Sequence, residues 1–116
     1  MDELVAALTS LASMQNLRER AFEGCGEWLR NTQRDGQHCI DGWAVVEIEP
    51  HFASCSLVFA HERLDYPFVD TKLQLCVRDQ SGSHRQPIGY YRLITRLDGS
   101  VDDDYFVIDH PKPTDG

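Results

Sequence analysis

The sequence has few lysines and no cluster of basic residues. Two lysines and nine arginines stand against nineteen Asp and Glu residues, which gives a net charge of −8. Binding to the phosphates of nucleic acid requires clustered cations that displace counterions, whereas the cations here are scattered among acidic residues. The composition therefore argues against nucleic acid as a partner.

Long hydrophobic runs are also missing. No stretch approaches the roughly 20 consecutive apolar residues that a membrane-spanning helix requires. The chain opens with the acidic residues Asp2 and Glu3, where a secretory signal would be basic. We therefore expect a cytoplasmic protein that does not contact a membrane. In that reducing compartment, the four cysteines are expected to be free thiols.

Several motifs with known chemistry do not occur. No two cysteines have the Cys-x-x-Cys spacing of structural zinc ligands, and the aspartates around Gly99 do not follow the pattern of an EF-hand calcium loop. Neither a Gly-x-Ser-x-Gly turn nor a glycine-rich phosphate loop is present. We therefore predict no metal, no cofactor and no catalytic residue. A role without catalysis is favoured, although the sequence leaves enzymatic activity open.

What is present is sufficient for one globular domain. A chain of 116 residues, of which 41% are hydrophobic, can form one core without disulfides or a structural metal. Residues 110–116 contain two prolines and no apolar anchor. We therefore predict a single α+β domain over residues 1–109, followed by a flexible tail over residues 110–116.

The first part of the chain has the periodicity of a helix. From Leu4 to Leu29, apolar residues recur every three or four positions. Gly24 and Gly26 interrupt this pattern, and a glycine inside a helix costs up to about 1 kcal/mol relative to alanine. The pattern predicts an N-terminal amphipathic helix that is kinked or broken near these two glycines. Asp35-Gly36 is expected to end it.

The rest of the chain has the pattern of a β-sheet. After residue 42, short runs of β-branched and aromatic residues alternate with turn signals. The helix is therefore expected to pack on a five-stranded antiparallel meander, which makes the fold class α+β. The expected strands span residues 43–49, 53–62, 71–78, 88–97 and 100–108, and Pro50 is expected to end the first of them. Asp98-Gly99 is typical of a two-residue type I′ hairpin turn.

This turn also predicts which residues share a face of the sheet. Counting outward from Asp98-Gly99 pairs Tyr91 with Phe106 on one face and Tyr90 with Val107 on the other. Both faces are therefore expected to be apolar at that end of the hairpin, whereas one helix covers only one face. The uncovered face would then need internal packing, a ligand, a second copy of the chain or another partner.

The leading hypothesis is a small acidic cytoplasmic binding protein of the immunity, inhibitor or regulatory type. It would act by contact with another protein that presents a basic surface. Acidic side chains would steer that partner, and aromatic side chains would anchor it. The residues predicted for this contact are Asp102, Asp103, Asp104, Tyr90, Tyr105 and Trp43.

Two alternatives remain. One is a small-molecule-binding or enzymatic domain in which the helix and a curved sheet enclose an apolar pocket. Its predicted lining residues are Tyr91, Phe106, Phe59 and Trp28. The other is a homodimer that uses the uncovered face of the sheet and has no further activity. The sequence does not identify the partner, the ligand or the oligomeric state.

Overall fold

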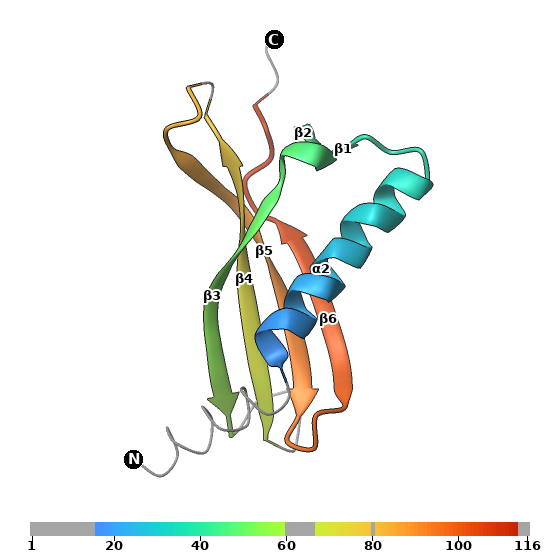
Figure 1. Cartoon of the computed structure of the whole chain (residues 1–116), viewed down its shortest axis with the longest axis vertical. Coiled ribbons are helices and arrows are strands. Elements are labelled where there is room, and N and C mark those ends of the chain that lie inside the picture. Colours follow the sequence, from blue (N-terminus) through green and yellow to red (C-terminus); the bar gives the residue numbers. More distant parts are fainter. Residues whose placement is uncertain (1–15, 60–66, 80, 114–116) are drawn as a thin grey trace.

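A helix lies across an antiparallel sheet in the computed structural model, which describes residues 16–59, 67–79 and 81–113 (Figure 1). The helix α2 spans Leu17–Arg34. The main sheet has the strand order β3-β4-β5-β6. Its strands span Glu49–Val58 (β3), Phe68–Arg78 (β4), Arg85–Arg96 (β5) and Val101–Ile108 (β6). The predicted α+β class is confirmed. Among the described residues, no helix combines the length and apolar character needed to cross a bilayer.

The helix α2 runs without interruption through both glycines, so the predicted kink or break is wrong. Gly24 lies where Tyr91 of β5 approaches the helix, and a Cβ atom at this position would clash with the Tyr91 hydroxyl. The glycine therefore serves a close helix-to-sheet contact rather than a break. Gly26 lies on the same helix, where a Cβ atom would meet only the end of the flexible Arg30 side chain.

The predicted helix can be compared with the structure at its C-terminal end. The helix starts after Asn16, which has a left-handed backbone with φ 51°; the expected helix before that residue lies outside the described residues. At the other end, Gly36 has φ 81°, and the N–H of Gln37 donates to the carbonyl of Thr32 at 3.1 Å. This arrangement is a Schellman motif, which confirms the predicted helix end.

The sheet has four strands rather than the predicted five. Residues 43–49 do not form one strand: Trp43–Ala44 (β2) pairs with Cys39–Ile40 (β1), and a 3-10 helix follows at Val45–Glu47. Pro50, expected to end a strand, instead lies within β3. Because β3 is at the edge of the sheet, it can accommodate a proline, which a central strand would not.

The last hairpin has the predicted pairing around its aromatic residues. Tyr90 pairs with Val107, and Tyr91 pairs with Phe106. Successive residues of a strand point to opposite faces, so Tyr91 and Phe106 face α2 whereas Tyr90 faces away. Nearer the turn the register differs, with Thr95 opposite Val101, and a bulge between Ile94 and Thr95 restores the predicted pairing.

The turn of this hairpin is not the predicted type I′ turn. Gly99 has a positive φ of 91°, whereas the φ of Asp98 is not positive. The N–H of Gly99 donates to the carbonyl of Arg96 at 3.0 Å, and a bulge occurs between Ile94 and Thr95. A type I turn followed by a left-handed glycine and a bulge requires positive φ at one position only.

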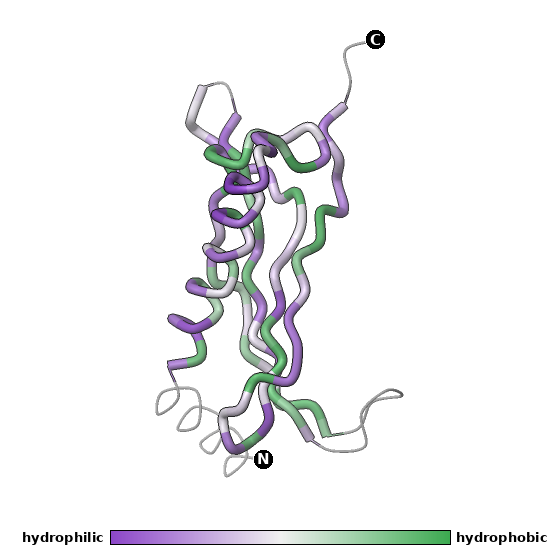
Figure 2. The backbone as a smooth tube through the Cα atoms, turned by 90° about the vertical axis from the view of Figure 1, so that its right-hand side faces the viewer, coloured by the Kyte–Doolittle hydropathy of each residue, from purple (hydrophilic) through white to green (hydrophobic). Residues whose placement is uncertain are grey.

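The core fills the space between α2 and one face of the main sheet. Figure 2 shows the helix as a layer beside the strands. The buried cluster contains Ala21, Cys25, Trp43, Ile48, Leu73, Leu75, Val77, Ile88, Tyr91 and Leu93. Cys25, which is fully buried, belongs to this cluster, and all four cysteines are free thiols. The helix is therefore fixed to the sheet by a continuous apolar contact.

The other face of the main sheet, called here the helix-free face, carries Asp70, Lys72, Tyr90 and Arg92. Arg92 Nη2 lies 2.6 Å from Asp70 Oδ2, and Lys72 Nζ lies 4.9 Å from the centre of the Tyr90 ring. Phe68 and Ile94 lie on the same face and are buried, with 2% and 3% exposure. The expectation of a second apolar face therefore holds only in part, because this face combines buried apolar side chains with charged ones.

The two helix glycines generate a first prediction. Gly24→Ala is expected to lower the free energy of unfolding by about 1–3 kcal/mol, because the new methyl group displaces the buried Tyr91 ring. Gly26→Ala is expected to raise it by up to about 1 kcal/mol, the difference in helix propensity. Urea unfolding of both variants measures the contrast. Equal changes in the two variants would contradict the role assigned to Gly24.

Burial of Cys25 generates a second prediction. Burial raises the pKa of its thiol to about 12, from 9.0 in an exposed chain. The contribution of the buried, neutral thiol to the free energy of unfolding is therefore complete below pH 9. It is lost as the pH rises from 9 toward 12, because the thiol ionises first in the unfolded chain. In this range the loss approaches about 1.4 kcal/mol per pH unit. Unfolding between pH 9 and 10 should show a shallower decline for Cys25→Ala; identical slopes would refute the prediction.

Candidate functional site

The structure brings four of the predicted residues together where α2 crosses β5 and β6. Asp104 comes from the residues predicted for partner contact. Trp28, Tyr91 and Phe106 come from those predicted to line a pocket. They converge from three elements of the fold, the helix and the last two strands.

One carboxylate oxygen holds the two layers of the fold at this point. Asp104 Oδ2 accepts a hydrogen bond from the Tyr91 hydroxyl at 2.9 Å and another from the Trp28 indole N–H at 3.0 Å. The Trp28 ring also stacks on Phe106, with ring centres 5.8 Å apart and planes inclined by 21°. The Trp28 side chain is therefore fixed by two separate contacts with β6.

Local structure places each of these groups. Asp104 and Phe106 are two residues apart on β6, so both side chains face α2, whereas Asp103 and Tyr105 face away. On α2, Trp28 lies one turn after Gly24, on the same side of the helix. The space above Gly24 admits the Tyr91 hydroxyl that reaches Asp104.

The Tyr91 hydroxyl remains a donor throughout the physiological pH range. Burial raises its pKa first, and the hydrogen bond to Asp104 and the negative charge of Asp104 raise it further. A phenol with such a pKa stays protonated, so it does not act as a base near neutral pH. Its role at this site is to hold the Asp104 carboxylate in position.

A groove follows this side of the molecule between α2 and β6. Two depressions of about 460 and 500 Å³ share Gly24, Glu27 and Asp104 among their lining residues. We call this feature the α2–β6 groove and define it by Glu23, Gly24, Glu27, Trp28 and Asp104. Three of these five residues carry carboxylates, and Trp28 supplies an aromatic surface.

The cations beside the α2–β6 groove are already engaged. Arg20 Nη2 donates to the carbonyl of Gly99 at 2.8 Å, which ties the helix to the β5–β6 turn. Arg30 Nη2 lies 2.9 Å from Glu27 Oε1, and this hydrogen bond is the main cause that lowers the Glu27 pKa. Glu27 is therefore ionised at neutral pH, and the groove keeps a negative character.

The other predicted acidic residues have different surroundings. Asp102 Oδ1 lies 3.5 Å from Arg96 Nη2 in an ion pair. Asp103 is exposed, and its Oδ1 accepts the backbone N–H of Asp104 at 2.8 Å. The three successive aspartates therefore do not form one patch, and only Asp104 lies in the groove.

The remaining predicted residues lie elsewhere. Tyr90 and Tyr105 are on the helix-free face, where Arg92 lies 5.9 Å from the centre of the Tyr105 ring. Trp43 is a buried residue of β2, and its indole N–H donates to the carbonyl of His110 at 2.8 Å. Phe59 follows β3 and is 57% exposed. The structure therefore divides the predicted residues among several surfaces.

Sequence reasoning missed the acidic residues of the helix. Glu19, Glu23 and Glu27 recur every four residues, a spacing that places them along one side of a helix. This signal was readable in the sequence. The expected break at the glycines would have divided that side, which concealed it.

The groove combines carboxylates with an exposed indole. Carboxylates beside an exposed indole favour a cationic side chain, which can pair with the acids and stack on the ring. Within the described part of the chain, no three His, Cys, Asp or Glu residues are grouped so that they could hold a metal ion.

The bridging carboxylate generates a third prediction. Asp104→Ala is expected to lower the free energy of unfolding by about 2–3 kcal/mol, because the buried Tyr91 hydroxyl loses its charged acceptor. Asp103→Ala, on the same strand but exposed, is expected to change it by at most about 0.5 kcal/mol. Adding Tyr91→Phe to Asp104→Ala should recover part of the loss. Urea unfolding tests the set, and similar effects of the two alanine variants would exclude the bridge.

Comparisons with known proteins add no family to this description. No protein-family model, curated protein or solved structure matches the chain. The function must therefore be argued from the chemistry of the site itself.

Proposed function

We propose that the protein acts by protein–protein contact and that its α2–β6 groove receives a basic segment of the partner. The observation that carries this proposal is the state of Trp28, which is 43% exposed although its indole N–H and its ring are both held by β6. Tryptophan is enriched among the residues that dominate binding energy. An immobilised side chain also loses little entropy on binding.

The charge of the groove supports a basic occupant. Glu27 and Asp104 line one depression with Trp28, and Glu23 lines the adjoining one. The carboxylates of the two depressions outnumber the two arginines that line them, and the whole chain has a net charge of −8. Such a field accelerates association with a cationic surface and slows association with an anionic one. An arginine of the partner can stack on the indole and pair with a carboxylate at the same time.

The edges of the main sheet favour contact through side chains rather than through an added strand. On β6, the carboxylate of Asp103 already accepts the backbone N–H of Asp104. On β3, Pro50 has no N–H, and the register shifts between Phe52 and Ser54. Prolines, bulges and charged residues are the features that protect edge strands from further pairing. The groove is therefore the more suitable contact surface.

A fourth prediction tests this function with matched variants. The wild-type chain and the double variant Glu23→Gln/Glu27→Gln are used to capture partners from cell extract. The control, Asp41→Asn/Asp109→Asn, removes two exposed carboxylates away from the groove. A partner of the groove is expected to be retained by the wild type and the control, and lost or reduced with the groove variant.

Binding of the purified partner gives the quantitative result. The groove variant is expected to weaken binding about tenfold, mainly through slower association, with a smaller effect at high salt. Trp28→Ala is expected to weaken it about 30-fold or more, as a hot-spot residue does. Equal retention by the groove variant and the control, or affinity that does not depend on salt, would contradict the proposal.

A further inference from the structure

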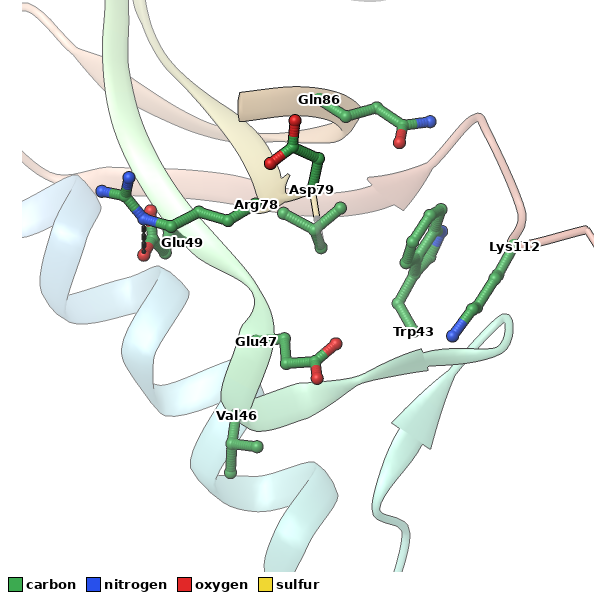
Figure 3. A pocket seen from close by; sticks show the side chains of 9 residues that line it. Trp43, Val46, Glu47, Glu49, Arg78, Asp79, Gln86 and Lys112 are labelled. Carbon is green, nitrogen blue, oxygen red and sulfur yellow. Dashed lines mark hydrogen bonds and ion pairs between the residues drawn. The ribbon is translucent and has the colours of Figure 1, made fainter. Parts of the chain in front are cut away.

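A separate cleft of about 680 Å³ lies where the β1–β2 hairpin and its 3-10 helix approach β4 and β5. Figure 3 shows side chains from these elements around one hollow. The residues that matter for its chemistry are Trp43, Glu47, Glu49, Arg78, Asp79 and Lys112. None of them belongs to the α2–β6 groove.

The cleft already holds an ammonium group from the chain itself. Lys112 Nζ lies 5.7 Å from the centre of the Trp43 ring. Figure 3 shows the Lys112 side chain beside Trp43, with Glu47 lining the same hollow. An ammonium above an indole ring is attracted by the negative face of the ring. The cleft is therefore chemically suited to this type of cation.

The segment that carries Lys112 is anchored by two hydrogen bonds. The Lys112 N–H donates to the carbonyl of Asp41 at 2.9 Å, and the Trp43 indole donates to the carbonyl of His110 at 2.8 Å. At Gly42, with φ 87°, a Cβ atom would lie 2.9 Å from Lys112 Cβ. Lys112 itself is exposed, so a small local opening is enough to withdraw its side chain.

Withdrawal of Lys112 would leave the cleft with a deficit of positive charge. Glu49 is paired with Arg78, with Oε1 and Nε 3.0 Å apart. Among the described residues, no cation forms an ion pair with Glu47 or Asp79. A hydrogen bond from the Ser81 hydroxyl is the main cause that lowers the Asp79 pKa, so this carboxylate is ionised at neutral pH.

We propose that this cleft is a binding site for alkylammonium groups, with Trp43 as its aromatic wall and Lys112 as an internal occupant that an external ligand displaces. The shared chemistry of the ligand is a primary or methylated amine on an alkyl chain. Two sources present it: a small free amine and a lysine or methyllysine side chain of another protein. This inference goes beyond the proposed function and does not depend on it.

The test follows the two tryptophan indole N–H signals of the full-length chain by NMR. Choline and N-acetyl-trimethyllysine amide are the probes, and sodium chloride at the same ionic strength is the control. Lys112→Ala removes the internal occupant and is expected to bind about fivefold more tightly than the wild type, the equivalent of one cation–π contact. The Trp43 signal should shift in a saturable way, whereas the Trp28 signal serves as the internal reference.

Further variants distinguish a change in ligand binding at the cleft from a general effect on folding. Lys112→Gln keeps a polar side chain, slightly shorter than that of lysine, but not its charge, and it is expected to bind more tightly than the wild type as well. Glu47→Gln in the Lys112→Ala chain is expected to weaken binding. Tighter binding of the trimethyllysine probe than of choline would indicate a protein side chain as the ligand, and the reverse would indicate a free amine.

Three results would overturn the proposal. The first is no saturable shift of the Trp43 signal in a folded Lys112→Ala or Lys112→Gln chain. The second is an equal shift of both indole signals, or an equal shift with sodium chloride. The third is an affinity of the Lys112 variants no higher than that of the wild type. None of these results would affect the α2–β6 groove, whose proposed contact depends on other residues.

Discussion

The Asp104 carboxylate determines how the helix lies on the sheet. Its Oδ2 joins Tyr91 of β5 to Trp28 of α2, while Phe106 supports the Trp28 ring. Apolar packing alone is not directional, so it leaves a helix free to slide or rotate on a sheet. Two hydrogen bonds to one charged oxygen have defined directions. The position of α2, and with it the α2–β6 groove, follows from this contact.

This constraint explains which parts of the fold the sequence predicted. The pairing of Tyr91 with Phe106 was predicted from the position of a turn, and it holds because the bulge between Ile94 and Thr95 offsets the different turn. The role of Gly24 was not predicted, because helix propensity contains no information about a tyrosine hydroxyl 67 positions later in the chain. Pro50 was misjudged for a similar reason: its effect depends on whether its strand is central or at an edge, which is a property of the assembled sheet.

The candidate site also contains features that the sequence predicted and features that it did not. The face of β6 that carries Asp104 was implied by the predicted register, since Asp104 and Phe106 alternate with Tyr105. What the sequence could not supply was the rotation of α2, because several residues of an amphipathic helix can face the same strand. Trp28 and Asp104 are 76 positions apart, and only the folded core brings them together. Aromatic residues that the sequence assigned to a hollow pocket instead pack against one another around a carboxylate.

The distribution of charge explains why the negative character of the chain is local. On the helix-free face, Arg92 is paired with Asp70, and Lys72 lies over Tyr90. In the groove and in the cleft beside Trp43, the carboxylates outnumber the cations that line the same surface. Because salt screens exposed charges beyond about 8 Å, a cation senses these two places rather than the net charge of the chain. Each combines carboxylates with a tryptophan, and the difference between them is occupancy: the chain places its own Lys112 beside Trp43 and leaves Trp28 43% exposed.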